Sequence, residues 1–429
     1  MDSIKISPAV LSGKVKVPPS KSYAHRALLA AFLSGDECKI NNIKLSDDIK
    51  ATLGCIDALG AEYIFDEKKA SVSILKSSKD RSTKKIKLDC GESGSTLRFL
   101  IPIALCFAEK LEFTGRGRLM ERPMTPYFKI FDEKGILYKQ KKSALSINGK
   151  LCAGDFKIDG SVSSQFITGL LFALPLLDGD SRIIIEGTLT SRGYIDITLD
   201  VLKKYGIKIT NDNYECFIVK GKQTYKARNY TVEGDFSQAA FFLTAGAIGC
   251  NITCSGLKEN SLQGDKKIID IIRSTGALVE KSSASTLRAA CSANMHGITV
   301  DADEIPDLVP ILAVLLAFCK GESRIVNAGR LRIKESDRLS AICSVLKSLG
   351  ADITEGEDFL IIKGTQVLSG STVSSFNDHR IAMAAAIAAC RCEGDVIIEG
   401  AKKSVAKSYP DFFEDYIKLG GDANECLGK

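Results

Sequence analysis

The 429-residue sequence contains no tryptophan and only three histidines, His25, His296 and His379. Neither the histidines nor the fourteen cysteines have the spacing of metal ligands, and no Cys-x-x-Cys pair occurs. We therefore expect no metal centre and no disulfide framework. Cysteines scattered in this way usually act as small apolar core residues in a reducing compartment, which predicts a cytoplasmic protein.

Long apolar segments are also missing. The longest run, residues 308–319, contains Pro310 and is too short to cross a bilayer, and the first residues lack the apolar segment of a signal peptide. The 58 basic and 52 acidic residues leave a net charge of only +6. This dispersed excess does not form the basic stripe that nucleic-acid binding requires. The sequence thus predicts no membrane and no nucleic-acid partner, and it favours small anionic ligands over an ordinary solvated surface.

What the sequence does contain is a sixfold repeat. At intervals of roughly 70 residues, a polar or charged helix cap runs into a short apolar stretch with helical character. The six starts are Ser20, Ser93, Ser163, Asp235, Ile305 and Asn377. Apolar residues on all sides, as in residues 382–389, indicate that these helices are buried. Helix N-termini also offer unpaired N–H groups and positive dipole ends, which suit anions.

Each buried helix is followed by further elements in a fixed order. A glycine-bounded strand rich in β-branched residues comes next, then an amphipathic helix that ends at glycine, then one or two strands. We expect the second helices at residues 48–60, 127–135, 196–206, 266–276, 337–350 and 411–420. The predicted fold is α/β (α+β in some schemes), with two domains of three βαβαββ repeats each. Periodicity places the boundary near residues 226–230 and leaves open which domain the N-terminal strand joins.

Lys21 and Arg26 stand at the start of the first buried helix, directly after Pro18, Pro19 and Ser20. A cation at this end of a helix opposes the helix dipole. An anionic ligand therefore explains the pair better than folding alone does, the alternative being basic residues that face solvent.

Other helix starts carry polar groups as well. Gly94 lies in a glycine- and hydroxyl-rich turn whose N–H groups could approach an anion, while Ser163, Ser164 and Gln165 could cap a helix or bond a ligand. Further charged residues at or near helix starts are Arg122, Lys334, Arg338, Arg380 and Lys407, with the carboxylates Asp307 and Glu335.

Alternatives remain for single members of this set. Asp307 could simply stabilise a helix start, residues 334–338 could form a solvated face, and the Asp235 cap is expected to be mainly structural. Taken together, however, the residues predict a site between two domains that binds two anionic substrates and transfers protons.

The chain resembles the enolpyruvyl transferases, and among them the EPSP synthase family, over its whole length. The resemblance rests on residues 19–26, 91–98, 121–123, 163–165, 194–198, 233–235, 305–307, 334–338, 377–380 and 407–411. It implies two domains of three βαβαββ units: 19–230, and 1–18 with 231–429. It also implies a monomer without cofactor that transfers the enolpyruvyl group of phosphoenolpyruvate to the 5-hydroxyl of shikimate 3-phosphate through a tetrahedral intermediate.

The resemblance also implies roles for individual residues. Shikimate 3-phosphate would contact Lys21, Ser22, Arg26, Ser163, Ser164, Gln165, Ser191, Asp307 and Lys334. Phosphoenolpyruvate would contact Lys21, Gly94, Arg122, Gln165, Arg338, Arg380 and Lys407. Asp307 would accept the hydroxyl proton, and Glu335, with Lys21 nearby, would protonate the methylene carbon.

Three residues depart from the commonest family pattern: Glu92, Phe99 and Arg330 stand where asparagine, proline and asparagine are usual. A related family that acts on a UDP-amino sugar is disfavoured, because its mobile-loop cysteine has no counterpart between Cys106 and Cys152. A relative that binds RNA ends, or one without activity, would show a stronger basic face and would not need Asp307 together with Glu335.

Overall fold

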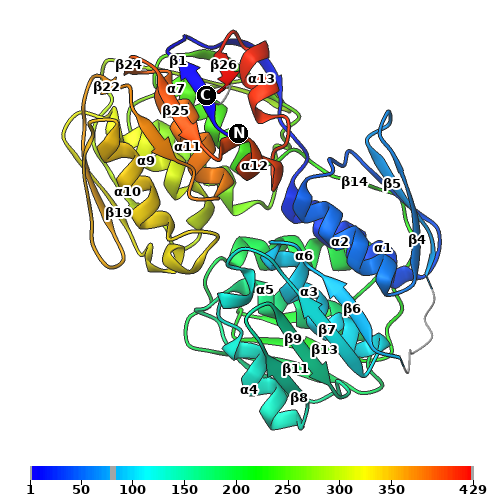
Figure 1. Cartoon of the computed structure of the whole chain (residues 1–429). Helices are drawn as coiled ribbons and strands as arrows, with labels where there is room; N and C mark the ends of the chain where they lie inside the picture. Colours follow the sequence, from blue (N-terminus) through cyan, green and yellow to red (C-terminus); the bar gives the residue numbers. More distant parts are fainter. Residues whose placement is uncertain (1, 78–83, 427–429) are drawn as a thin grey trace. The chain divides into compact units, whose positions relative to one another are not determined.

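The computed structural model describes residues 2–77 and 84–426, which form two compact units (Figure 1). Unit 1 consists of residues 1–18 and 234–429, and unit 2 of residues 19–233. The N-terminal strand therefore belongs with the C-terminal half of the chain. The second crossing lies between Glu233 and Gly234, a few residues beyond the expected position.

Each unit contains three four-stranded sheets of one design, in which one pair of strands is parallel and two pairs are antiparallel. The sheets of unit 2 are, in spatial order, β14 (Tyr230–Thr231), β3 (Cys38–Asn41), β5 (Ser71–Ser77) and β4 (Ala61–Asp66); β6 (Ile86–Asp89), β7 (Lys110–Thr114), β9 (Ala144–Asn148) and β8 (Leu137–Gln140); and β10 (Asp155–Asp159), β11 (Ser181–Glu186), β13 (Cys216–Val219) and β12 (Ile209–Asp212).

Unit 1 repeats this design. Its sheets are β2 (Ser12–Lys16), β15 (Asn251–Ser255), β17 (Thr286–Ala290) and β16 (Leu278–Ser283); β18 (Thr299–Asp301), β19 (Glu322–Val326), β21 (Leu360–Lys363) and β20 (Asp352–Glu355); and β23 (Thr372–Ser374), β25 (Val396–Glu399), β1 (Ile4–Ser7) and β26 (Asp422–Glu425). A small parallel pair, β22 (Leu368–Ser369) and β24 (Cys392–Glu393), accompanies them. The sixfold repeat predicted from the sequence is thus confirmed.

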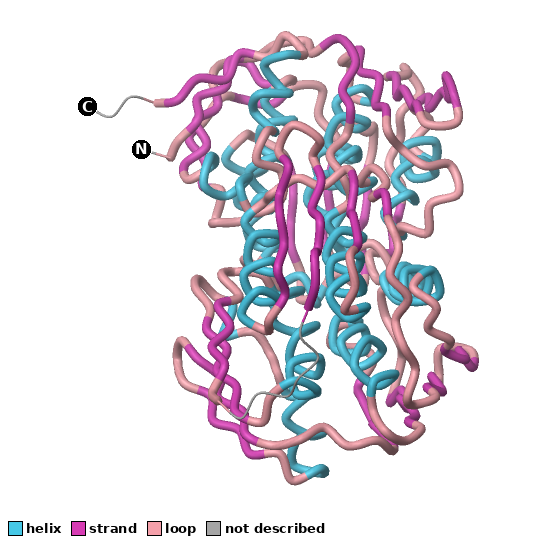
Figure 2. The backbone as a smooth tube through the Cα atoms, turned by 90° about the vertical axis from the view of Figure 1, so that its right-hand side faces the viewer, coloured by secondary structure: helices cyan, strands magenta, loops and turns pink. Residues whose placement is uncertain are grey.

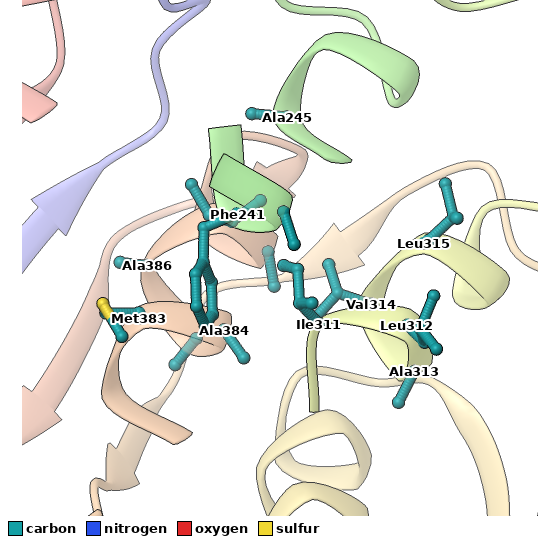
Figure 3. Packing of buried hydrophobic residues seen from close by; sticks show 14 of the residues in the cluster. Phe241, Ala245, Ile311, Leu312, Ala313, Val314, Leu315, Met383, Ala384 and Ala386 are labelled. Carbon is teal, nitrogen blue, oxygen red and sulfur yellow. The ribbon is translucent and has the colours of Figure 1, made fainter. Parts of the chain in front are cut away.

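Six buried helices, one per repeat, form the centres of the two units. They are α1 (Lys21–Ser34), α3 (Gly94–Phe107) and α5 (Ser164–Ala173) in unit 2, and α7 (Phe236–Ala247), α9 (Val309–Ala317) and α11 (His379–Ala389) in unit 1. Every residue of α7, α9 and α11 is buried. Figure 3 shows Phe241 of α7, Ile311 and Val314 of α9 and Ala384 of α11 meeting in the core of unit 1.

The second helices of the repeats match the predicted segments closely. They are α2 (Asp47–Ala58), α4 (Thr125–Lys134), α6 (Arg192–Lys204), α8 (Ile268–Ser274), α10 (Arg338–Ser348) and α13 (Phe412–Lys418), with the additional α12 (Ala401–Ala406). Short 3-10 helices are η1 (Leu119–Glu121), η2 (Leu174–Leu176), η3 (Gly264–Lys267), η4 (Pro306–Leu308) and η5 (Gly329–Ile333). Figure 2 distinguishes the helices from the strands of the same repeats. Within the described parts of the chain, no helix is both long and apolar enough to cross a membrane.

Two strands pair in a different unit from the helix that follows them in the sequence. β2 precedes α1 in sequence but pairs in parallel with β15 of unit 1, and β14 precedes α7 but pairs in parallel with β3 of unit 2. Backbone hydrogen bonds continue from each strand, with Val17 donating to Ser255 and Val232 donating to Asn41. The segments that lead into α1 and α7 are therefore each held by a sheet of the unit that the chain is leaving.

Candidate functional site

The repeat places one side chain in an equivalent position at each of the six buried helix starts. The residue before the helix caps it in five repeats: Ser20, Ser93, Ser163, Asp235 and Asp378 accept N–H hydrogen bonds from the first turn. In the fifth repeat the short helix η4 begins after Ile305 instead. The residues two positions beyond these six starts are Ser22, Ser95, Gln165, Ser237, Asp307 and Arg380. Seven candidate residues lie at or directly beside these positions: Lys21, Ser22, Gly94, Ser164, Gln165, Asp307 and Arg380.

Nearly all N–H groups of the Arg26 guanidinium, in α1, donate to acceptors within unit 2. Its guanidinium donates to the hydroxyls of Thr198 (2.8 Å) and Thr168 (3.3 Å), and to the carbonyls of Tyr194 and Ser22. Burial lowers its pKa to about 10. Only one Nη1 hydrogen lacks an acceptor among the described residues, so Arg26 can offer a ligand a single hydrogen bond. Its other bonds orient Ser22 and join α1 to α5 and α6.

Lys21 forms an ion pair with Asp48 at the start of α2, with 2.7 Å between Nζ and Oδ2. Beneath this pair, buried hydroxyls connect three helices. Thr52 Oγ1 lies 2.7 Å from both Nδ1 of His25 and Oγ1 of Thr96, and Thr96 donates to the Ser93 hydroxyl. Burial holds the pKa of His25 well below its ordinary value, so the imidazole is neutral. The start of α1 is thereby fixed relative to α2 and α3.

Gly94, Arg122 and Gln165 come together at the starts of α3 and α5. A Cβ on Gly94 would lie 2.6 Å from Nη1 of Arg122 and 3.6 Å from Oε1 of Gln165. Gln165 accepts from Arg98 (2.8 Å) and donates to Ser95 (3.0 Å). The missing side chain therefore allows two polar side chains to approach the first turn of α3.

The remaining predicted serines lie at helix starts in unit 2. Ser163 caps α5 by accepting from the N–H of Gln165 (3.3 Å), and Ser164 is buried in the first turn. Ser191 precedes α6 with φ of 57°, in the left-handed region that non-glycine residues rarely adopt. Such conformations occur more often at functional sites, and Ser191 is also buried.

In unit 1 the buried guanidinium of Arg338 contacts three carboxylates, each through a different nitrogen. Nε donates to Asp378 (2.8 Å), Nη1 to Asp307 (2.9 Å) and Nη2 to Glu335 (2.5 Å). Arg380 contacts the opposite oxygen of Asp307 at 2.8 Å and also donates to the Asp307 carbonyl. The carboxylate of Asp307 thus lies between two arginines.

This arrangement sets the ionisation of the cluster. Burial disfavours the charged form of Asp307, but the charges of Arg380, Arg338 and Lys334 outweigh it and hold its pKa well below the ordinary value. Burial likewise opposes the charge of Arg338, whose pKa is nevertheless raised by Asp378, Glu335 and Asp307. Asp307 is therefore a firmly ionised carboxylate in the unliganded chain.

Lys334 and Lys407 are the other two basic candidate residues of unit 1. Burial lowers the pKa of Lys334 to about 8 against the opposing effect of Asp307. Lys407 is buried and donates to the carbonyl of Asn377 (2.7 Å), directly before α11. Lys334 therefore titrates close to neutral pH.

Two of the predicted basic residues lie between the end of one helix and the start of the next. Arg122 follows η1 directly and lies three residues before α4, and Lys407 follows α12 directly and lies five residues before α13. The Asp235 cap was expected to be mainly structural. Its carboxylate accepts from Ser237, whose hydroxyl in turn accepts from Arg380 (3.2 Å), so this repeat also supports the charged cluster.

Asp48, Ser237 and Asp378 are the site residues that the sequence reasoning did not assign. Their signal was positional: Ser237 occupies the same place in its repeat as Gln165 and Arg380, and Asp378 caps the sixth buried helix. Aligning the six helix caps by residue, rather than comparing their composition, would have found the last two.

The three departures from the family pattern have local partners. Phe99 is buried and stacks under the guanidinium of Arg26, with 4.9 Å from Cζ to the ring centre. Arg330 donates to both the carbonyl and the carboxylate of Asp303. Glu92 lies so close over Gly117 that a Cβ there would be 2.6 Å from its Oε2. Over residues 2–77 and 84–426, no group of three or more histidine, cysteine or acidic side chains is placed to hold a metal ion.

Comparison with known proteins places this geometry in context. A family model described as EPSP synthase (3-phosphoshikimate 1-carboxyvinyltransferase) matches residues 6–416. The chain is 50% identical to the 3-phosphoshikimate 1-carboxyvinyltransferase of Clostridium acetobutylicum, over 99% of each chain. It is also 50% identical to that of Clostridium novyi, over the full length of both.

Solved structures agree in fold. EPSP synthase from Acinetobacter baumannii superimposes with a TM-score of 0.79 at 25% identity, covering 99% of this chain and all of the other. The enolpyruvyl transferase NikO from Streptomyces tendae superimposes with a TM-score of 0.77 at 15% identity, covering 98% of each chain. At that lower identity the likeness concerns the fold alone.

Proposed function

Since the chain belongs to the EPSP synthase family and catalyses carboxyvinyl transfer in the shikimate pathway, we propose how its own residues carry out this reaction. The observation that carries the proposal is the position of Asp307 between Arg338 and Arg380, beside Glu335. The cluster combines cations able to hold a carboxylate with two carboxylates able to move protons. Enolpyruvyl transfer to a hydroxyl needs both functions.

In this proposal, shikimate 3-phosphate is held by hydroxyl and cationic groups. Ser22, Ser163, Ser164 and Ser191 bond its phosphate and hydroxyls, together with Lys21, Arg26, Gln165, Asp307 and Lys334. The left-handed backbone of Ser191 and the single remaining hydrogen of Arg26 support their assignment. Arg26 acts mainly by orienting the first turn of α1.

Phosphoenolpyruvate takes the remaining cations. Arg338 and Arg380 bind the carboxylate of phosphoenolpyruvate. Both guanidinium groups already contact the carboxylate of Asp307, so they converge on a position where a second carboxylate can bind. Lys21, Arg122 and Lys407 neutralise its phosphate, with Gln165 beside them and Gly94 leaving the space. In this arrangement, Lys21 and Gln165 touch both substrates.

Asp307 accepts the proton of the 5-hydroxyl. A carboxylate whose pKa lies far below neutral is a weak base. When the carboxylate of phosphoenolpyruvate engages Arg338 and Arg380, part of their charge is neutralised and the pKa of Asp307 rises. Substrate binding therefore makes Asp307 a stronger base at the moment when it is needed.

Glu335, assisted by Lys21, delivers a proton to the methylene carbon of phosphoenolpyruvate. This protonation makes the neighbouring carbon open to attack by the 5-oxygen and gives a tetrahedral intermediate. The C–O bond to phosphate then breaks, and phosphate leaves with the proton that Asp307 accepted. Glu335 takes back a methyl proton, which restores the double bond. The surrounding cations stabilise the departing phosphate.

The proposal includes a cytoplasmic monomer that uses no cofactor or metal and acts on the two small substrates alone. All fourteen cysteines are free thiols, which accords with a reducing compartment.

The experiment is release of phosphate from shikimate 3-phosphate and phosphoenolpyruvate by wild type and three variants. Asp307→Asn and Glu335→Gln keep side-chain size, and we expect kcat to fall by at least about 10²-fold in each. Asp301→Asn, which alters an exposed carboxylate bonded to Asn327, serves as the control and should retain wild-type rates. Full activity in both test variants would refute the assigned proton roles.

A further inference from the structure

The carboxylate of Asp378 is completely buried at the start of α11 and has three described donors. Oδ2 accepts from Nε of Arg338 (2.8 Å) and from the hydroxyl of Ser336 (3.1 Å). Oδ1 accepts from the backbone N–H of Arg380 (2.9 Å). A buried carboxylate is costly unless such bonds satisfy it. Asp378 therefore bonds the side chain of Arg338 and the backbone of Arg380.

The nitrogen of Arg338 that Asp378 contacts determines which nitrogens face the other carboxylates. A guanidinium has one edge formed by Nε and another formed by its two Nη groups. Asp378 takes Nε, which leaves the Nη groups facing Asp307 and Glu335. Its other oxygen fixes the first turn of α11, from which the Arg380 side chain extends.

We propose that Asp378 is a positioning residue for phosphoenolpyruvate. Its carboxylate holds Nε of Arg338, so that the Nη groups stay directed to the substrate carboxylate. Its helix cap fixes the backbone of Arg380 and thereby the point from which that side chain extends. This inference rests on the proposed roles of Arg338 and Arg380. Asp378 touches neither substrate and acts only through the two arginines. Ser336 supports it by donating to the same oxygen.

Asp378→Asn tests the proposal, because asparagine retains an acceptor for the helix cap while losing the charge that holds Nε. We expect KM for phosphoenolpyruvate to rise by about tenfold or more, the effect of a lost hydrogen bond to a charged group. KM for shikimate 3-phosphate should change by less than about twofold. A purely structural role would lower Tm and the active fraction while leaving both KM values unchanged.

Asp155→Asn provides the control. Asp155 also accepts from Nε of an arginine, Arg182 (2.8 Å), but this exposed pair lies on β10 and β11 of unit 2. KM for phosphoenolpyruvate should stay near wild type in this variant. If Asp378→Asn proves too unstable to assay, Ser336→Ala decides instead, since a milder rise in the same KM is expected. The proposal is overturned if KM for phosphoenolpyruvate is unchanged in Asp378→Asn. If that variant cannot be assayed, an unchanged KM in Ser336→Ala overturns it.

A double-mutant cycle separates this inference from the assigned role of Arg338. In an Arg338→Ala background, Asp378→Asn should raise KM for phosphoenolpyruvate much less than it does alone, because the group it positions is gone. Equal effects in both backgrounds would overturn the positioning role. If Arg338→Ala by itself left KM unchanged, the substrate assignment of Arg338 would be the part that fails.

Discussion

Gly94 illustrates how one absent side chain can determine a site. The first turn of α3 lies against Arg122, and a Cβ at Gly94 would come within 2.6 Å of its Nη1. No real Cβ contact is that short, so any larger residue must move the guanidinium. The proposed phosphate-binding position of Arg122 thus depends on glycine at this point.

Gly94→Ala should therefore raise KM for phosphoenolpyruvate by about tenfold, the loss expected for one charge-assisted hydrogen bond. KM for shikimate 3-phosphate should stay within about twofold, as measured by steady-state kinetics with each substrate varied. Gly54→Ala is the control, because Gly54 lies in α2 and a Cβ there would meet nothing within 4 Å. That variant should keep both KM values and gain up to about 1 kcal/mol in stability.

The lowered pKa of Lys334, again a property of a single residue, predicts that activity depends on pH. Burial lowers its pKa to about 8 from 10.5, so the ammonium loses its charge as the pH rises through 8. Because Lys334 is assigned to shikimate 3-phosphate, kcat/KM for that substrate should fall above pH 8 in wild type. Lys334→Arg should remove this decline, since a guanidinium does not titrate there. A decline that persists in the arginine variant would show that another group titrates.

The same shift affects stability with the opposite sign. The unfolded chain binds a proton at Lys334 between pH 8 and 10.5, whereas the folded chain does not. The contribution of Lys334 to the free energy of unfolding therefore increases with pH across this window and is smallest below pH 8.

Residue types in the sequence predicted most members of the charged cluster, but not which side chains contact each other. A cation at a helix start is unfavourable because it opposes the helix dipole, so its presence there indicates an anionic ligand. This argument identifies Arg338 and Arg380. The roles of Asp378 and Ser237 depend on which neighbour each side chain faces, and a buried acid in a helix cap looks the same in sequence whether or not it holds an arginine. Such pairings arise from tertiary packing and leave no local pattern.

Among the elements, α3 and α5 pack with unusual closeness. A Cβ at Gly169 of α5 would lie 2.4 Å from the hydroxyl of Tyr127 and 2.6 Å from the carbonyl of Arg98. That hydroxyl lies 2.7 Å from the carbonyl of Arg98 and 3.0 Å from the carbonyl of Phe166, and its single hydrogen, shared between them, bridges the two helices. Gly94 and Gln165, at the starts of these helices, depend on this spacing.

Gly169→Ala should therefore force the helices apart and destabilise the protein by about 1–3 kcal/mol, the usual cost of overpacking. Chemical denaturation gives the free energy of unfolding, and Gly54→Ala is again the control. If Gly169→Ala unfolded at the wild-type denaturant concentration, the helices would have to be less tightly packed than the distances indicate.

The elements themselves could be predicted well because hydrophobic periodicity and glycine stops are local signals. Five buried helices start next to the predicted caps. The fifth repeat differs because Pro306 and Pro310 restrict the backbone, so a 3-10 turn at Pro306–Leu308 precedes the α-helix that begins at Val309. The choice of sheet for β2 and β14 could not be predicted from periodicity, since each strand could pair in either unit.

For the whole molecule, the fourteen thiols provide a test that requires no substrate. Cys152 and Cys291 are exposed, whereas the other twelve are buried or half-buried. A thiol reagent should modify two groups rapidly in the native protein and all fourteen after unfolding. Replacing Cys152 and Cys291 by serine should abolish the rapid phase, and Tm should be the same with and without reductant. A reductant-dependent Tm would indicate a disulfide and contradict the free-thiol state.

Unit 1 is built from both ends of the sequence, and this imposes an order on biosynthesis. β1 can complete its sheet only when β25 and β26 have been made, more than 380 residues later in the chain. At ordinary elongation rates this takes about 20–80 s. Unit 2 has all its strands as soon as β14 emerges, so it can fold while unit 1 is still being translated. β1 therefore leaves the ribosome long before its partners and waits in an unpaired state that chaperones can bind.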